Sequence, residues 1–133
     1  MAKTFRLQIV TPEKLEFDED VEIVVAPGIE GELGIMADHL PLITRLKIGV
    51  LKILTESEEI TMAVSEGYLE VTRERVLILA EAAELPEEIN VQRALEAKRR
   101  AEERLASAEK QDFARAQAAL ERAMTRLKVA GRQ

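Results

Sequence analysis

Six arginines in the last third of the chain form two rows with the same spacing. Within each row the residues lie seven and then four positions apart, so each row falls on one face of a helix. The rows are Arg93, Arg100 and Arg104, and then Arg115, Arg122 and Arg126. Guanidinium groups from two facing helices would match phosphate oxygens bidentately, which predicts a clamp for a polyanion. The alternative is helix-flank charges with local partners, such as Glu96 for Arg100.

Residues that carry most enzyme chemistry are scarce. His39 is the only histidine and cysteine is absent, which argues against a zinc site and against thiolate chemistry. Ser57, Ser65 and Ser107 do not lie in a nucleophile-elbow context, so no catalytic triad is predicted around His39. We expect His39 to be a loop residue held by local backbone, or alternatively an interface residue. No catalytic and no metal-binding residue is predicted.

The other polar clusters of the first 85 residues are expected to be structural. The acidic run Asp18-Glu19-Asp20 and the group at Glu56, Glu58 and Glu59 are typical of solvated loops. None of the glycines between positions 28 and 67 lies between a strand and a helix, as a phosphate-binding loop requires. We interpret them as turn and bulge positions.

Composition narrows the class of protein. The chain has 133 residues, 47% of them hydrophobic and 33% charged, enough for one core. Aromatic residues make up 3% and tryptophan is absent, so stacking platforms for single-stranded nucleic acid are not expected. The N-terminal residues do not resemble a signal peptide, and no apolar run approaches the ~20 residues that cross a bilayer. A reducing compartment fits the lack of cysteine.

Charge is distributed unevenly along the chain. Residues 1–86 carry 8 basic and 17 acidic side chains, a balance of −9, whereas residues 87–133 carry 11 and 8, a balance of +3. The acidic first part argues against nucleic-acid binding there. The basic second part favours an acidic protein surface or a phosphate-bearing ligand.

The hydrophobic pattern changes at Leu85-Pro86. Before it, short alternating segments separated by Gly, Pro and acidic residues predict an antiparallel β-sandwich over residues 1–85, which we call the head. A hairpin is expected between residues 47–54 and 59–64. The predicted strands are Thr4–Val10, Val21–Ala26, Gly31–Ile35, Lys47–Leu54, Glu59–Val64, Tyr68–Thr72 and Val76–Ala80.

Residues 86–133 are predicted to form an antiparallel pair of helices, which gives an α+β fold overall. Pro86 or the N-cap Asn90 would begin helix one, which ends near Ala106; a turn at 109–112 precedes helix two, with Asp112 as N-cap. The two apolar stripes have steps of three and four. They comprise Ala94, Ala97, Ala101, Leu105 and Ala108, and then Phe113, Ala116, Leu120, Ala123, Leu127 and Ala130. Alanine seams bury little area, so this hairpin should be marginally stable and able to move.

The whole sequence resembles the epsilon subunit of the rotary, proton-translocating ATP synthase of bacteria and chloroplasts. The order, spacing and total length of several short motifs carry this resemblance. They are Val10-Thr11-Pro12, Gly31-Glu32-Leu33-Gly34-Ile35-Met36, His39-Leu40-Pro41-Leu42, Gly67-Tyr68-Leu69-Glu70-Val71, Val76-Leu77-Ile78-Leu79-Ala80, Arg93-Ala94 and Arg122-Ala123-Met124-Thr125-Arg126-Leu127.

The resemblance implies a non-catalytic subunit of the central stalk. Its head would bind the gamma subunit and the ring of c subunits through one turn bearing Glu30, Glu32 and His39. Its helical tail would permit turnover when folded against the head. Extended along gamma, it would oppose ATP hydrolysis and meet the catalytic alpha and beta subunits. The subunit would then be peripheral, on the cytoplasmic face of a bacterial cell membrane, and attached only through the complex.

The resemblance also implies ATP as a regulatory ligand of the folded tail, with no cofactor required. Some relatives bind ATP through a motif of Ile or Leu, Asp, two variable residues, Arg and Ala; here Asn90 replaces the Asp, which removes a negative charge. The implied site residues are Glu84, Ile89, Asn90, Arg93, Ala94, Arg100, Arg122 and Arg126.

Three other functions are alternatives to a central-stalk subunit. A stand-alone nucleotide sensor would use the head only as a scaffold. A small hydrolase would depend on His39 but lacks a nucleophile motif, and the acidic head disfavours a nucleic-acid adaptor.

Overall fold

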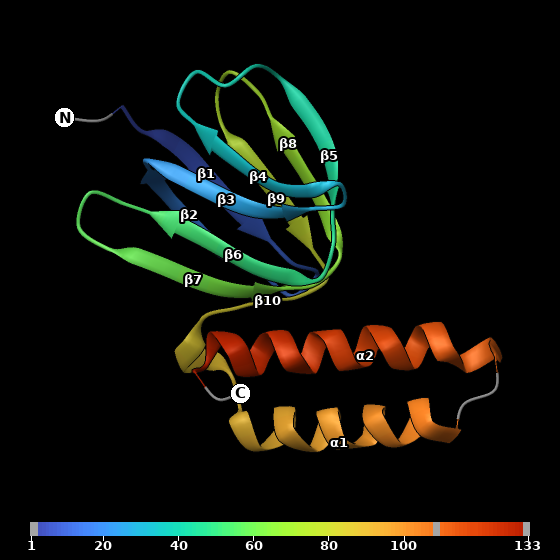
Figure 1. The fold of residues 1–133 in the computed structure, drawn as a ribbon. Coiled ribbons are helices and arrows are strands. Elements are labelled where there is room, and N and C mark those ends of the chain that lie inside the picture. Colours follow the sequence, from blue (N-terminus) through green and yellow to red (C-terminus); the bar gives the residue numbers. More distant parts are fainter. Residues whose placement is uncertain (1–2, 108–109, 132–133) are drawn as a thin grey trace.

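The computed structural model of the chain describes residues 3–107 and 110–131. Over these residues, ten strands come first and two long helices follow (Figure 1). The strands are β1 Phe5–Val10, β2 Leu15–Val21, β3 Ile23–Gly28, β4 Gly31–Met36, β5 Leu42–Leu46, β6 Gly49–Leu54, β7 Glu59–Val64, β8 Gly67–Val71, β9 Val76–Ala80 and β10 Ala83–Glu84. A 3₁₀ turn, η1 Pro86–Glu88, leads to α1 Val91–Ser107 and α2 Lys110–Val129.

The strands form the expected β-sandwich. Their order is β10-β7-β6-β3-β5-β8-β9-β1-β2, with β4 on the free edge of β3. The sheet bends sharply where β3 and β5 share only the pairing of Gly28 with Leu46. The strands on the two sides of this bend therefore form two layers that face each other. Neighbouring strands run antiparallel except β1 and β9, which pair in parallel from Leu7–Val76 onward. That parallel pair joins the two ends of the head sequence.

Strand alternation fills the space between the two layers. Every second residue of β1 and β9 points inward, so Leu7, Ile9 and Ile78 have no exposed surface. Leu51 and Ile53 on β6 meet them from the other layer. Among the described residues, this buried core therefore lies wholly within the head and contains no residue of α1 or α2.

Some strand predictions were wrong. The acidic run at Asp18 lies within β2, where Arg6 of β1 donates to the Asp18 carboxylate at 2.7 Å. Cross-strand ion pairing allows charge on the outer face of a strand whose inner face carries Phe17 and Val21. β5 and β10 were also missed, and β3 begins at Ile23 instead of Val21.

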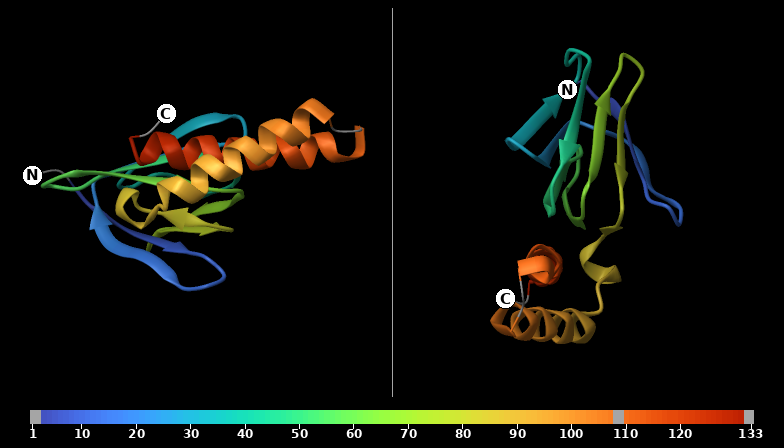
Figure 2. Two further views of the ribbon diagram at one scale, coloured as in Figure 1. Left: turned by 90° about the horizontal axis from the view of Figure 1, so that it is seen from below. Right: turned by 90° about the vertical axis from the view of Figure 1, so that its right-hand side faces the viewer.

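The two helices form the expected antiparallel hairpin, and α2 lies between α1 and the head (Figures 1 and 2). Helix α2 packs on β7 and β6. The buried side chains of the described part of the hairpin are Ala94, Ala101, Ala116, Ala123 and Leu127. All five belong to the predicted stripes. Four other stripe residues are half-buried: Ala97, Leu105, Leu120 and Ala130. Ala108 lies outside the described residues.

The beginning of helix two was predicted incorrectly. Helix α2 begins at Lys110, so Asp112 lies in its first turn and does not cap it, and residues 110–112 are not a separate turn. Phe113 is 53% exposed and lies in the first turns of α2, the end of the helix that extends beyond the head (Figure 1). Neither described helix is both long and apolar enough to cross a membrane.

Candidate functional site

Within the described part of the chain, two ion pairs connect α2 to the head. Arg126 Nε lies 2.5 Å from Glu84 Oε1, and Arg122 Nη2 lies 3.0 Å from Glu66 Oε2. The arginines are four residues apart, so their side chains leave the same face of α2. The carboxylates come from different places in the head, Glu84 from β10 and Glu66 from the β7–β8 connection. The folded position of the hairpin therefore depends on polar contacts as well as on packing.

The Glu66 carboxylate is held in its charged form. Its pKa lies below the ordinary value, because its own backbone N–H and then the Arg122 guanidinium stabilise the anion. The loop that carries it is fixed to the β9–β10 connection, since Glu81 N–H donates to the Glu66 carbonyl and Ser65 N–H to that of Ala82. A rigid loop thus presents an anionic group to α2.

The beginning of α1 has the predicted N-cap. Asn90 Oδ1 accepts the backbone N–H of Arg93 at 3.0 Å, and the Ala94 N–H donates to the Asn90 carbonyl. Ile89 is buried in front of the cap, and Ala94 is buried in the seam between the helices. Asn90 therefore supplies the oxygen acceptor that an Asp would supply, without its charge.

The structure brings together part of the residue set implied for ATP. Glu84, Arg122 and Arg126 line one narrow space between β10 and α2. Arg93 and Arg100 are exposed on α1, the outer helix. Beyond Arg126 lies a cleft of about 300 Å³. Five of the residues that line this cleft are glutamates, so its surface is mainly acidic. The lining residues are Glu13, Glu16, Glu81, Glu84 and Glu88, with Thr11, Lys14, Ala82, Ala83 and Arg126.

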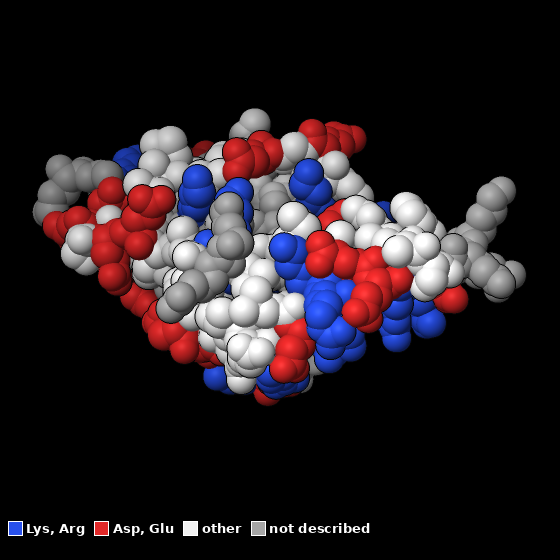
Figure 3. All heavy atoms as spheres, turned by 60° about the horizontal axis from the view of Figure 1, so that its bottom comes forward, with Lys and Arg blue, Asp and Glu red and all other residues white. Residues whose placement is uncertain are grey.

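The arginine rows do not face each other in this arrangement. The second row points its last two members, Arg122 and Arg126, at head carboxylates. The suggested local pair of Glu96 with Arg100 is wrong within the described residues, since the Glu96 carboxylate accepts the Gln92 amide instead. The local pair on α1 is Arg99 with Glu103 at 2.8 Å. Basic side chains nevertheless gather over the hairpin, among acidic ones (Figure 3).

The three predicted partner-binding residues do not share one turn. Glu30 and Glu32 flank Gly31 at the β3–β4 turn, where a φ of 132° requires glycine. His39 follows the other end of β4, and the five residue steps from Gly31 to Met36 span about 16 Å at ~3.3 Å per residue. His39 Nδ1–H donates to the Leu40 carbonyl at 2.7 Å, which confirms a loop histidine held by local backbone. One turn cannot present all three because β4 separates them.

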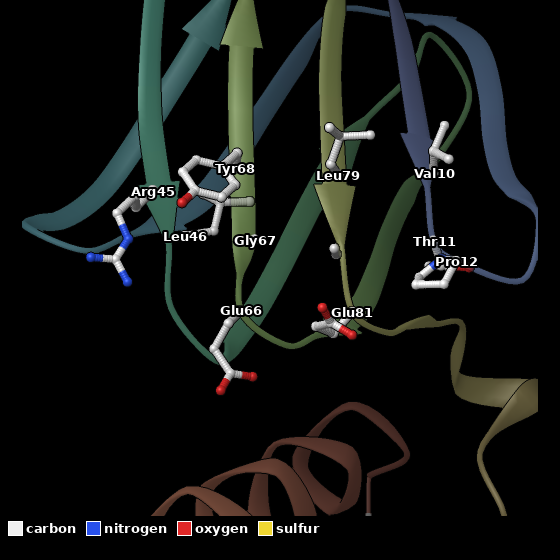
Figure 4. Close-up of a pocket in the computed structure, with 11 residues that line it drawn as sticks. Val10, Thr11, Pro12, Arg45, Leu46, Glu66, Gly67, Tyr68, Leu79 and Glu81 are labelled. Atoms are coloured by element: carbon white, nitrogen blue, oxygen red, sulfur yellow. The ribbon is translucent and has the colours of Figure 1, made fainter.

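A pocket of about 450 Å³ was not predicted from the sequence. It lies on the outer face of the head, at the end nearest α2 (Figure 4). Arg45, Tyr68, Leu79 and Val10 are successive cross-strand partners on β5, β8, β9 and β1, and all four line it. Only strand pairing brings them together. The sequence contains one signal for this pocket. Consecutive strand residues such as Ile78 and Leu79 are both apolar, so the outer face of the strand is apolar as well as the inner face.

The two ion pairs of α2 lie apart from His39 and involve only arginines and carboxylates. Among residues 3–107 and 110–131, no group of three or more His, Asp or Glu side chains could hold a metal ion. The β4–β5 connection, which carries His39, lies at the opposite end of the head from the hairpin (Figure 1). The polar groups that do meet are arginines and carboxylates, which bind and hold surfaces.

Two family models match consecutive parts of the chain. The ATP synthase Delta/Epsilon chain beta-sandwich domain matches residues 4–86, and the ATP synthase Delta/Epsilon chain long alpha-helix domain matches residues 87–131. The chain is 49% identical over 131 residues to the ATP synthase epsilon chain of Desulforamulus reducens, covering 98% of this chain and 99% of that one. The corresponding protein of Shouchella clausii is 49% identical over 127 residues, covering 96% and 95%.

Solved structures share the fold. A chain of the Euglena gracilis mitochondrial ATP synthase, in an OSCP/F1/c-ring structure, has a TM-score of 0.81 at 23% identity and covers 96% of this chain and 81% of that chain. A chain of the Tetrahymena thermophila mitochondrial ATP synthase central stalk/c-ring has a TM-score of 0.61 at 16% identity, covering 97% and 98%. With both of its parts matched in order and half of its residues shared with named relatives, this chain belongs to the delta/epsilon chain family of ATP synthases.

Proposed function

We propose that this chain is the non-catalytic epsilon subunit of a bacterial ATP synthase central stalk. Its head binds the gamma subunit and the c ring, and so couples proton translocation to ATP synthesis. The relatives that carry the name ATP synthase epsilon chain support this proposal. The protein would then be peripheral on the cytoplasmic face of the cell membrane, held there by the c ring. Glu30, Glu32 and His39 remain the proposed contacts, now as two separate patches.

The hairpin would inhibit ATP hydrolysis when it leaves the head. The observation that carries this is its sparse attachment: two partly exposed ion pairs and a small packed area on β7 and β6. The hydrophobic core of the head contains no helix residue, so the hairpin can move without disrupting it. Once extended, its basic side chains would meet the alpha and beta catalytic subunits.

Charge reversal at Arg126 tests the inhibitory role. Arg126→Glu places two carboxylates together at Glu84 and should open the hairpin, so ATP hydrolysis by a complex reconstituted with this variant should fall. Glu84→Arg combined with Arg126→Glu restores the attraction and should return hydrolysis toward the wild-type rate. If Arg126→Glu leaves the rate unchanged while exchange shows an open hairpin, the hairpin does not inhibit.

ATP would act by stabilising the folded hairpin. The proposed ligands are Glu84, Ile89, Asn90, Arg93, Ala94, Arg100, Arg122 and Arg126. Arg122 and Arg126 already contact carboxylates, so phosphate groups must share or displace those contacts. A ligand specific for the folded form adds about 2.7 kcal/mol at a hundredfold excess over its Kd. That would decide the population of so sparsely attached a hairpin.

The ATP proposal is tested on the isolated chain. Millimolar ATP should raise the melting temperature, and Arg93→Ala or Arg126→Ala should abolish the increase. Asn90→Asp is the informative companion, because it keeps the helix cap and supplies the carboxylate of the relatives' motif; it should strengthen binding. A flat calorimetric titration for both wild type and Asn90→Asp would reject ATP as a ligand.

A further inference from the structure

The pocket on the outer face of the head joins apolar walls to a carboxylate end. Val10, Tyr68 and Leu79 provide side walls, and Glu66 and Glu81 lie at the end next to α2 (Figure 4). Tyr68 is 53% and Leu79 47% exposed, so large apolar surface faces outward here. The guanidinium of Arg45 points away from Leu79 and Glu81 (Figure 4), which leaves the carboxylate end without a cation from the pocket walls.

This combination suits a lysine or arginine side chain. Such a side chain lays an aliphatic stem along apolar surface and keeps its charge at a polar end. A neutral apolar group would leave the Glu81 carboxylate without a cation, and an acidic group would be repelled by both carboxylates in a head of net charge −9 over residues 1–86. We propose that the pocket binds a basic side chain of the protein that docks on the head, and that Glu66 couples this binding to release of the hairpin.

Glu66 belongs to both sites. It lines the pocket, and its Oε2 accepts Arg122 Nη2 at 3.0 Å. A second cation at this carboxylate competes with Arg122 for its oxygens and repels the guanidinium. Both side chains are partly exposed, so we expect the coupling to be roughly two- to fivefold. Because coupling is reciprocal, an open hairpin should strengthen docking by the same factor.

Glu81 provides the matched control. It lines the same pocket, but among the described residues it forms no ion pair with α2. Glu81→Gln therefore changes the pocket and keeps the ion pair between Glu66 and α2, whereas Arg122→Gln removes that ion pair and leaves the lining of the pocket unchanged. Glu66→Gln alters both. All three changes affect polar side chains outside the buried core, and melting curves would verify that each variant folds.

The experiment measures two quantities on the full chain with its cognate gamma subunit, because the inference rests on the proposed docking of the head to gamma. Since the chain has no cysteine, Ser57→Cys and Ser107→Cys give two unique sites for spin labels on the head and the hairpin. The distance between the labels reports opening, and titration gives the Kd for gamma. Failure of wild type to bind gamma at all would overturn the proposed function itself.

Each variant has a distinct expected result. Gamma should increase the open fraction of wild type. Arg122→Gln should open the hairpin without gamma and lower the Kd two- to fivefold. Glu81→Gln should stay closed alone and bind gamma more weakly, and Glu66→Gln should be open alone and also bind more weakly than Arg122→Gln. Unchanged Kd values for both glutamate variants would reject the cation pocket. Gamma binding that leaves the distances unchanged, together with a wild-type Kd for Arg122→Gln, would reject the coupling.

Discussion

Leu127→Ala should detach α1 from α2 while leaving the head intact. Leu127 is 2% exposed, and it is the only large side chain among the buried residues of α1 and of the described part of α2, the others being alanines. Helix α1 depends on this seam because it lies on the far side of α2 from the head (Figure 1). Truncating one leucine therefore removes much of what holds the outer helix.

The expected magnitude follows from burial. Replacing a fully buried leucine by alanine costs about 2–5 kcal/mol, depending on how far the site collapses. Even the lower value changes the ratio of attached to detached α1 by about 30-fold, at 1.4 kcal/mol per factor of ten. The seam alanines, such as Ala94 and Ala101, cannot compensate because they bury little area.

Native-state hydrogen exchange measures this directly. In Leu127→Ala, the amides of α1 should lose at least about 30-fold of their protection, while those of β1 and β9 keep theirs, because the head core contains no hairpin residue. Leu95→Ala is the matched control: it removes the same atoms from a side chain that is 45% exposed, and should change protection by about twofold or less. Unchanged α1 protection in Leu127→Ala, an equal effect in Leu95→Ala, or equal loss in the head would each refute the reasoning.

Three further predictions concern other parts of the molecule. The pKa of Glu66 is lowered from 4.5 in the folded state, first by its own backbone N–H and then by Arg122, and only the Arg122 share stabilises the closed hairpin. That share is complete above pH 4.5 and is lost as pH falls through the lower folded pKa; the label distance should show this, and Glu66→Gln should abolish it. Gly67→Ala should lower the melting temperature by several degrees, because its Cβ would lie 1.9 Å from the Leu79 carbonyl oxygen, whereas Gly34→Ala meets nothing within 4 Å and should not. Asn90→Ala should increase exchange in the first turn of α1 by about fivefold, at ~1 kcal/mol for a lost N-cap, whereas Asn90→Asp should not.

Local patterns in the sequence were sufficient for several features. Alternation over residues 4–10 predicted one core strand, because side chains of a strand point to opposite faces, and the short apolar run over residues 76–80 predicted another. Steps of three and four identified the stripes that contain Ala116, Ala123 and Leu127. Asn90 was identified as a cap from its position before the first apolar-periodic residues. The family followed from the order of short motifs, and the comparisons confirm it.

Other features depend on contacts between distant parts of the chain. β2 was hidden because its outer face is acidic, and only pairing with Arg6 of β1 makes that face stable in a sheet. The last turn of helix one was placed correctly, but the start of helix two was not, since a polar residue such as Asp112 suits a first turn as well as a cap.

The sequence by itself determined the division of this protein into a β-sandwich and a helical hairpin, the alanine seam and the spacing of the arginines. These features are properties of neighbouring residues along one strand or helix. Only the tertiary structure decided where those arginines point. Helical spacing places Arg122 and Arg126 on one face, but it does not say what that face meets. The docking of α2 on the head brings them to Glu66 and Glu84, 56 and 42 residues away, and strand pairing places the pocket beside the first of these contacts.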